Sequence, residues 1–130
     1  MSLLFSEAKC QEKTNETEFG LYDAEDNTPV KINLTDKDLW NATVLNDKSK
    51  TILVTAIDHC IDLFRPNGEM EDRCDCMLTY DNTILLVELK NKRKNWQSEG
   101  LDQIENIVKI MIEQTPDFYC GFKKRKAVVA

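Results

Sequence analysis

Hydrophobic and polar residues alternate most clearly on either side of Asp81-Asn82. The flanking segments "RCDCMLTY" and "TILLVELK" are rich in apolar, aromatic and β-branched residues. Two such segments joined by a turn-forming pair predict an antiparallel hairpin. With the turn centred between Asp81 and Asn82, Asp75 faces Glu88, and their Cβ atoms are expected roughly 5 Å apart.

The two faces of this predicted hairpin differ in polarity. Side chains alternate between the faces of a strand, so Lys90 is expected on the same face as Glu88. The opposite face is predicted to be a continuous apolar surface made by Cys74, Cys76, Leu78, Leu85, Val87 and Leu89. Three charged groups, Asp75, Glu88 and Lys90, therefore share one face of an otherwise apolar strand pair.

An amphipathic helix is predicted after the hairpin, in "SEGLDQIENIVKIMIEQTP". Ser98 is expected to cap its start and Pro116 to close it. One helical face carries Leu101, Ile104, Ile107, Val108 and Met111. The following "DFYCGFKKRKAVVA" should end in a strand, and strand–helix–strand predicts a parallel crossover.

The first half of the chain gives weaker patterns. "FGLYD" and "PVKINL" predict two short strands around a loop, and Thr35 is expected to cap a short helix in "DKDLW". The stretch before Glu18 is polar and fits a short helix or an irregular arm. Residues 42–64 fit either a helix or a hairpin between "ATVLN" and "TILVTAID", and their many β-branched residues favour strands.

Length and composition indicate one globular domain, residues 1–130. Hydrophobic residues make up 42% and charged residues 31% of the chain. No apolar run reaches the roughly 20 residues of a membrane-spanning helix, and the N-terminus does not resemble a signal peptide. We therefore expect a cytoplasmic protein without a membrane partner, whose five cysteines are reduced thiols.

Charge is distributed unevenly along the chain, whose net value is −6. Residues 1–89 hold 8 Lys/Arg and 18 Asp/Glu, a net −10, whereas residues 90–130 hold 9 and 5, a net +4. The total argues against a general polyanion-binding protein. The basic runs "KNKRK" and "KKRK" are nevertheless compatible with a local cationic surface.

The expected contact between Asp75 and Glu88 requires a compensating charge. Like charges opposite each other destabilise a sheet. Lys90 supplies one positive charge, and a divalent cation would supply the rest. Carboxylate oxygens, completed by water and phosphate, suit Mg²⁺ or Mn²⁺.

These residues carry a resemblance to a known family. Asp75, "VELK" with Glu88 and Lys90, and Gln103 in "LDQIENI" follow the order of the PD-(D/E)xK nuclease superfamily. The stretch "RCDCMLTYDNTILLVELKNKRKNWQSEGLDQIENI" resembles its small members. The resemblance covers residues 50–130, the nuclease-like core, and leaves residues 1–40 as an N-terminal extension. Cys74 stands where the family pattern has proline.

The resemblance implies an α/β fold: a mixed sheet with a restriction-endonuclease-like core of antiparallel hairpin, helix and crossover strand. It also implies a Mg²⁺- or Mn²⁺-dependent nuclease in which Asp75, Glu88 and the Leu89 carbonyl bind the metal. Lys90 would position or deprotonate the attacking water, and Gln103 would hold water or substrate. Nucleic acid, DNA rather than RNA, is the implied partner, and a homodimer would suit a duplex.

Several other interpretations remain open. A catalytically inactive module that binds protein or nucleic acid is the main alternative. Asp58 could add a third acid from the neighbouring strand. Cys74, Cys76, His59 and Cys60 could form a zinc site, although a C-x-C pair lacks the usual spacing and core packing of the two strand cysteines is favoured.

Overall fold

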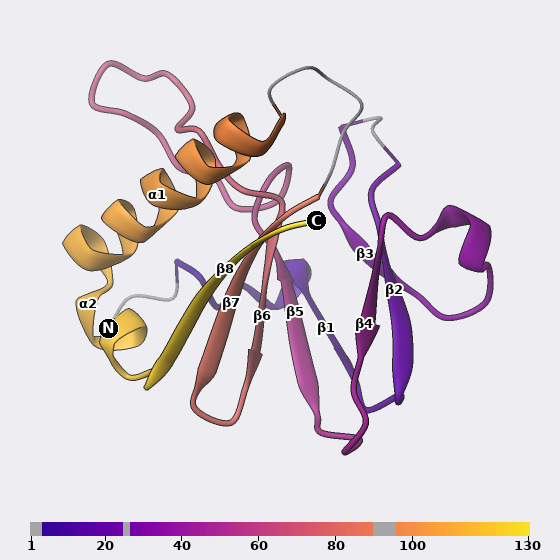
Figure 1. The fold of residues 1–130 in the computed structure, drawn as a ribbon. Coiled ribbons are helices and arrows are strands. Elements are labelled where there is room, and N and C mark those ends of the chain that lie inside the picture. Colours follow the sequence, from indigo (N-terminus) through magenta and orange to yellow (C-terminus); the bar gives the residue numbers. More distant parts are fainter. Residues whose placement is uncertain (1–3, 25–26, 90–95) are drawn as a thin grey trace.

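The computed structural model describes residues 4–24, 27–89 and 96–130, and for residues 96–98 it describes the backbone alone. It has three layers: two helices, a five-stranded mixed sheet and a three-stranded antiparallel sheet (Figure 1). Two 3₁₀ turns cover Ala8–Cys10 and Lys37–Leu39. Within the described ranges, no helix has both the length and the apolar character to span a membrane.

The five-stranded sheet has the strand order β1-β5-β6-β7-β8. Its strands are β1 (Gln11–Thr14), β5 (Ile52–Ala56), β6 (Cys76–Tyr80), β7 (Thr83–Glu88) and β8 (Lys124–Val129). The predicted hairpin is confirmed: β6 and β7 are antiparallel, with Cys76 facing Val87 and Leu78 facing Leu85. Asp81 supplies the turn with a φ of 49°, a left-handed conformation that Asp tolerates better than most residues.

The predicted crossover is also confirmed. Helix α1 (Trp96–Gln114) follows β7, and the short helix α2 (Pro116–Cys120) leads to β8, which is parallel to β7. Two details of the helix prediction are wrong. Ser98 lies inside α1 and not at its N-cap, and Leu101 is 48% exposed because the buried stripe starts at Gly100 and Ile104.

The three-stranded sheet has the order β3-β2-β4 and comprises β2 (Glu18–Tyr22), β3 (Lys31–Asn33) and β4 (Ala42–Leu45). The predicted strand pair β2–β3 is confirmed. Gly20 lets the Trp40 ring lie against β2, since a Cβ there would come within 2.0 Å of the ring. The short helical turn is capped by Asp36, one residue after the predicted Thr35.

The predicted hairpin between β4 and β5 is wrong, although both segments are strands. β4 pairs with β2, and β5 pairs with β1 and β6, so the two strands belong to different sheets. The polar segment before Glu18 also contributes a strand, β1, at the edge of the larger sheet. A polar edge strand has no buried face to reveal it in the sequence.

Two hydrophobic cores lie on opposite faces of the five-stranded sheet. Ile84, Leu86 and Met77 pack with α1 in the first, whereas the second lies between the sheets. The second contains Phe19, Leu21, Val30, Ile52, Val54, Cys76, Leu78, Val87 and Leu89. The predicted apolar surface is therefore present except at one position: Cys74 packs in the first core, away from Cys76.

The expectation that all five cysteines are free thiols is wrong for two of them. Cys10 and Cys60 form a disulfide, with their Cα atoms 5.9 Å apart. This bond attaches the segment before β1 to the turn after β5. Cys74 and Cys76 are free and buried, and Cys120 is free and exposed.

Candidate functional site

Asp75 and Glu88 lie at the same end of the β6–β7 hairpin, as the register predicts. Asp75 immediately precedes β6, and Glu88 is the last residue of β7. Their carboxyl groups are hydrogen-bonded to each other, and the Leu89 N–H donates to Asp75 Oδ2 at 2.7 Å. Both side chains are half-buried. Two like groups are thus held in contact on the face covered by α1.

Burial makes this pair a weak acid. Burial and the hydrogen bond with Asp75 raise the pKa of Glu88 to about 10, so the two carboxyl groups share a proton at neutral pH. Burial also raises the pKa of Asp75, while hydrogen bonds from Glu88 and Leu89 oppose that increase. The negative charges of Asp23 and Asp58 add to the rise at Asp75. Among the residues that the structure describes, the charges around the pair that shift its pKa values are therefore negative.

Asp58 is held close to the pair by the neighbouring backbone. The N–H groups of Ile57 and Asp58 donate to the Asp75 carbonyl at 3.0 and 3.3 Å. The Asp58 carboxylate is neutralised from the other side by Arg73, whose Nη2 lies 3.1 Å from Asp58 Oδ1. His59 Nε2 lies 3.3 Å from the other oxygen. Asp58 thus has a cation of its own in Arg73.

Arg73 is an unusually enclosed cation. Its side chain is only 10% exposed, and Nη1 donates to the Ile61 carbonyl at 2.9 Å. Within the described part of the chain, Arg73 Nε is buried without a hydrogen-bond partner. Such burial is costly unless the charge is paired, so the contact with Asp58 is structurally important.

Gly100 allows α1 to approach the acid pair. A Cβ at this buried position would lie 2.9 Å from Glu88 Cγ and 3.3 Å from Val129 Cγ1. Gln103 lies one helical turn further along α1 and is half-buried. Residues three apart share a helix face, so Gln103 lies towards the side that Gly100 presents to Glu88.

The residues present fit a hard divalent cation in their chemistry. Two facing carboxylates and the neighbouring Leu89 carbonyl are all oxygen donors, and Mg²⁺ commonly takes one or two carboxylates with water and phosphate. No cluster of three or more Asp, Glu, His or Cys ligands occurs among the residues that the structure describes. Lys90, the predicted activating residue, lies outside the described residues.

The sequence pattern did not single out three residues around the site: Asp23 and Gly100, which act on the pair, and Arg73, which contacts Asp58. Asp23 follows β2 and comes from a distant part of the chain, so no local signal points to it. Arg73 stands two residues before Asp75 in a loop that also carries Arg65 and several acids. Gly100 is a glycine inside an amphipathic helix, and that position usually signals close packing.

The predicted alternative zinc site does not form among the described residues. Cys60 is bonded to Cys10, and the Cys74 and Cys76 thiols lie in different cores. Burial raises the pKa of both of these thiols well above the ordinary value. Core packing, the favoured interpretation of the C-x-C pair, is confirmed.

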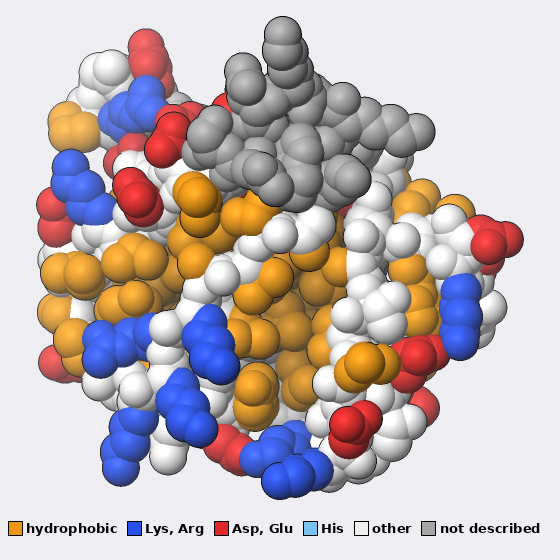
Figure 2. Space-filling view, viewed as in Figure 1, with side chains coloured by type: hydrophobic (Ala, Val, Ile, Leu, Met, Phe, Trp, Pro, Cys, Tyr) orange, Lys and Arg blue, Asp and Glu red, His pale blue; other side chains and the backbone are white. Residues whose placement is uncertain are grey.

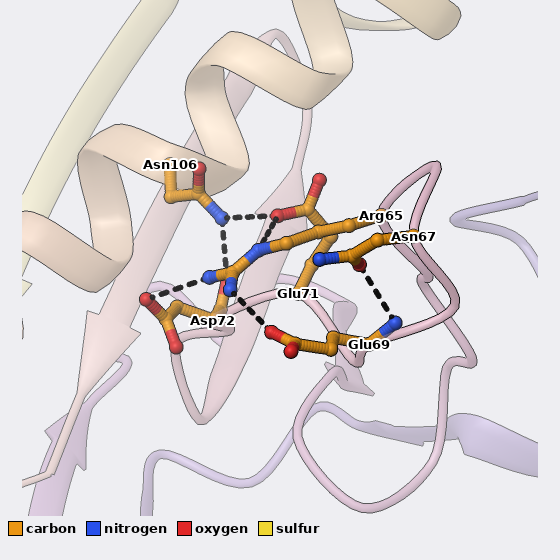
Figure 3. A network of polar contacts seen from close by, with 6 residues as sticks. All are labelled: Arg65, Asn67, Glu69, Glu71, Asp72 and Asn106. Atoms are coloured by element: carbon orange, nitrogen blue, oxygen red, sulfur yellow. Dashed lines mark hydrogen bonds and ion pairs between the residues drawn. The ribbon is translucent and has the colours of Figure 1, made fainter.

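A second acidic group surrounds Arg65 in the loop between β5 and β6 (Figure 3). Arg65 Nε lies 3.1 Å from Glu71 Oε1, and its two terminal nitrogens contact Glu69 and Asp72 at 3.5 and 3.3 Å. Asn106 of α1 donates to the Asp72 carbonyl at 2.8 Å. This Arg65 network attaches the loop to the helix beside the acid pair.

Comparisons with known proteins add no support for the nuclease resemblance and do not contradict it. No protein-family model matches the chain, and searches of curated proteins and of solved structures return no significant match. Any functional assignment therefore depends on the geometry of Asp75 and Glu88.

Proposed function

We propose that this protein is a divalent-metal-dependent phosphodiesterase that acts on nucleic acid. The observation that carries the proposal is the contact between Asp75 and Glu88. Burial and mutual repulsion disfavour ionisation of both carboxyl groups. A bound cation would favour it, and perturbed carboxyl pairs of this kind are typical of functional sites.

The arrangement of elements supports the same proposal. Antiparallel β5, β6 and β7 are followed by α1 and by β8 parallel to β7. This is the order of hairpin, helix and crossover strand that we expect of a restriction-endonuclease-like core. Asp75 and Glu88 occupy the ends of adjacent central strands, and Gln103 lies on the helix that covers them.

The proposed roles follow from each group's chemistry. Asp75, Glu88 and the Leu89 carbonyl would hold Mg²⁺ or Mn²⁺, which supplies Lewis-acid stabilisation of a phosphate and lowers the pKa of water. The Leu89 N–H fixes the orientation of the Asp75 carboxylate. Lys90 would orient or deprotonate the attacking water, and the Gln103 amide would position water or substrate.

The test is a Mn²⁺ titration by calorimetry with wild type, Glu88→Ala and Glu105→Gln. Glu105 is an exposed acid on α1 and serves as a matched control. We expect one site in wild type and in the control, and no measurable site in Glu88→Ala. Activity on DNA and RNA with Mn²⁺ should fall more than about 100-fold in the same variant, since even supporting residues of metal sites cost 10–100-fold.

The same experiment discriminates the alternative function. The described residues offer no third acidic ligand, which is the observation that favours an inactive binding module. A wild-type protein that binds no Mn²⁺ and cleaves neither DNA nor RNA would refute the nuclease proposal. We propose DNA as the preferred substrate and a homodimer as the active form; parallel DNA and RNA assays and sedimentation test these two points.

A further inference from the structure

A groove opens between the two sheets at the end opposite the acid pair. The smaller sheet leaves part of the β7–β8 face uncovered, and Figure 2 shows hydrophobic side chains within the resulting hollow. At the turn between β4 and β5 the hollow deepens into a pocket of about 210 Å³. This volume is below the 300–1,000 Å³ of most drug-sized sites, so its occupant must be small or thin.

The floor of the groove is mainly aliphatic. Val44, Ile52, Leu78 and Leu85 line the pocket. Leu45, at its edge, is 69% exposed although it is a large apolar residue. Ile52 and Leu78 are themselves buried, so the apolar surface that solvent reaches is formed by Leu45 and the half-buried Val44 and Leu85. Exposed aliphatic surface in a hollow is typical of a site for an apolar ligand.

The margin of the groove is cationic. Lys48 and Lys50 line the pocket, and Lys126 lies beside Leu85 in the parallel pairing of β7 and β8. Side-chain alternation places Lys124 on the same face of β8. Figure 2 shows Lys and Arg side chains, with some Asp and Glu side chains between them, along the lower margin of the hollow. Local positive charge in a chain of net charge −6 favours an anionic ligand.

Three of these lysines have no carboxylate partner among the described residues: Lys48, Lys124 and Lys126. Lys50 is paired with Asp81, and Glu18, which faces Leu45 in the β2–β4 pair, is paired with Lys37. Asp47 lines the pocket, and Glu16 lies next to the turn. An anion placed between Lys48 and Lys126 would meet cations that no described carboxylate already neutralises.

The floor argues for an aliphatic ligand and against a nucleic-acid strand. Single-strand binding relies on aromatic rings on which the bases stack. Tyr80 is the one ring that lines the pocket, and the Lys50 ammonium lies 5.9 Å from its centroid. A stacked base would have to displace that ammonium, whereas an alkyl chain could lie along Val44, Leu45 and Leu85.

We propose that this groove binds a small anionic amphiphile, of the class of medium-chain carboxylates. The alkyl chain packs on the aliphatic floor, and the carboxylate contacts the lysines of the margin. The site lies at the Asp81–Asn82 end of the hairpin, away from Asp75 and Glu88. It is independent of the proposed phosphodiesterase function.

The test is a titration of ¹⁵N-labelled protein with decanoate below its micelle concentration, followed by NMR. We expect saturable shifts in the β4–β5 turn and around Leu85. The double change Lys48→Glu with Lys126→Glu should weaken binding about tenfold, as reversal of two exposed charges predicts. Lys109→Glu, an exposed lysine on α1, is the matched control and should leave binding unchanged.

Three further measurements keep the proposal falsifiable. Decan-1-ol should bind more weakly than decanoate, and equal binding would refute the role of the lysines. Shifts spread over the whole surface would refute a site, as would binding of a single-stranded oligonucleotide but not decanoate at these residues. Glu88→Gln should bind decanoate normally, so failure here is separate from failure of the nuclease proposal.

Discussion

Two acidic regions beside α1 differ in how their charges are balanced. In the Arg65 network, three carboxylates surround one guanidinium and two of them are largely exposed. At the acid pair, Asp75 and Glu88 contact each other while half-buried, and their pKa values rise. A guanidinium contacts all three carboxylates of the first group, whereas no ion pair reaches the second within the described part of the chain.

This difference separates a structural cluster from a functional one. Exposed ion pairs contribute little to stability, typically below about 1 kcal/mol, but they can fasten a loop. A buried carboxyl pair costs stability unless something compensates it, so its presence indicates a bound cation or a shared proton. Four changes test this comparison.

The largest effect on stability is expected from Arg73→Met. This change leaves the Asp58 carboxylate without its buried partner while keeping a long apolar side chain in place. Breaking such a pair should cost about 2–3 kcal/mol, below the 3–5 kcal/mol of fully buried pairs because Asp58 is partly exposed. Urea unfolding measures the change. A loss below 0.5 kcal/mol would show that Arg73 is not needed to balance the acids.

The second-largest effect is expected in the pH dependence of the stability of the metal-free protein. The folded-state pKa of Glu88 is raised from 4.5 to about 10. Between these values the folded protein binds the proton more tightly than the unfolded chain, so stability is full at low pH and falls as pH rises through this window. Thermal midpoints should fall by several degrees between pH 6 and 9 in wild type and less in Glu88→Gln. Parallel profiles would refute the shared proton.

A smaller effect is expected from Gly100→Ala. The new methyl group would press on Glu88 Cγ and Val129, and overpacking should exceed the gain in helix propensity by about 1 kcal/mol. Asp102→Ala, at an exposed position of the same helix, is the control and should not destabilise. Mn²⁺ affinity should weaken in Gly100→Ala alone. An unchanged affinity would mean that α1 does not define the site.

The smallest effect is expected from Arg65→Gln. Two of its three ion pairs are with largely exposed carboxylates, so the free energy of unfolding should change by about 1 kcal/mol or less. Hydrogen exchange should nevertheless become faster in the loop between β5 and β6, because the network holds that loop to Asn106. A large loss of stability would contradict the distinction, because it would show that the charges of the Arg65 network are as strongly coupled to folding as those of the acid pair.

The hairpin and its acid pair could be predicted because their signals are local. Side chains alternate strictly, so the turn at Asp81-Asn82 fixes which residues face each other. That rule fails at Cys74, where the chain has left the regular strand and no longer alternates. The helix and crossover followed from a long amphipathic pattern and from Pro116.

The remaining features depend on contacts between distant segments. β4 and β5 are adjacent in sequence and strand-like, yet nothing local indicates that β4 pairs with β2. The Cys10–Cys60 bond joins residues 50 positions apart, and sequence spacing does not reveal such a pairing. The positions of Asp58 and Arg73 beside the acid pair likewise require the folded loop.

The Cys10–Cys60 bond makes the stability of this protein a function of redox conditions. Closing a loop of this length removes about 4 kcal/mol of conformational freedom from the unfolded chain, in the chain-entropy account. In a reducing compartment the bond opens, the unfolded chain regains that freedom, and the folded protein is less stable; in an oxidising compartment the bond persists. The same bond holds the turn that carries Asp58. The thiol–disulfide redox potential of the compartment therefore determines whether this turn is covalently attached to the segment before β1.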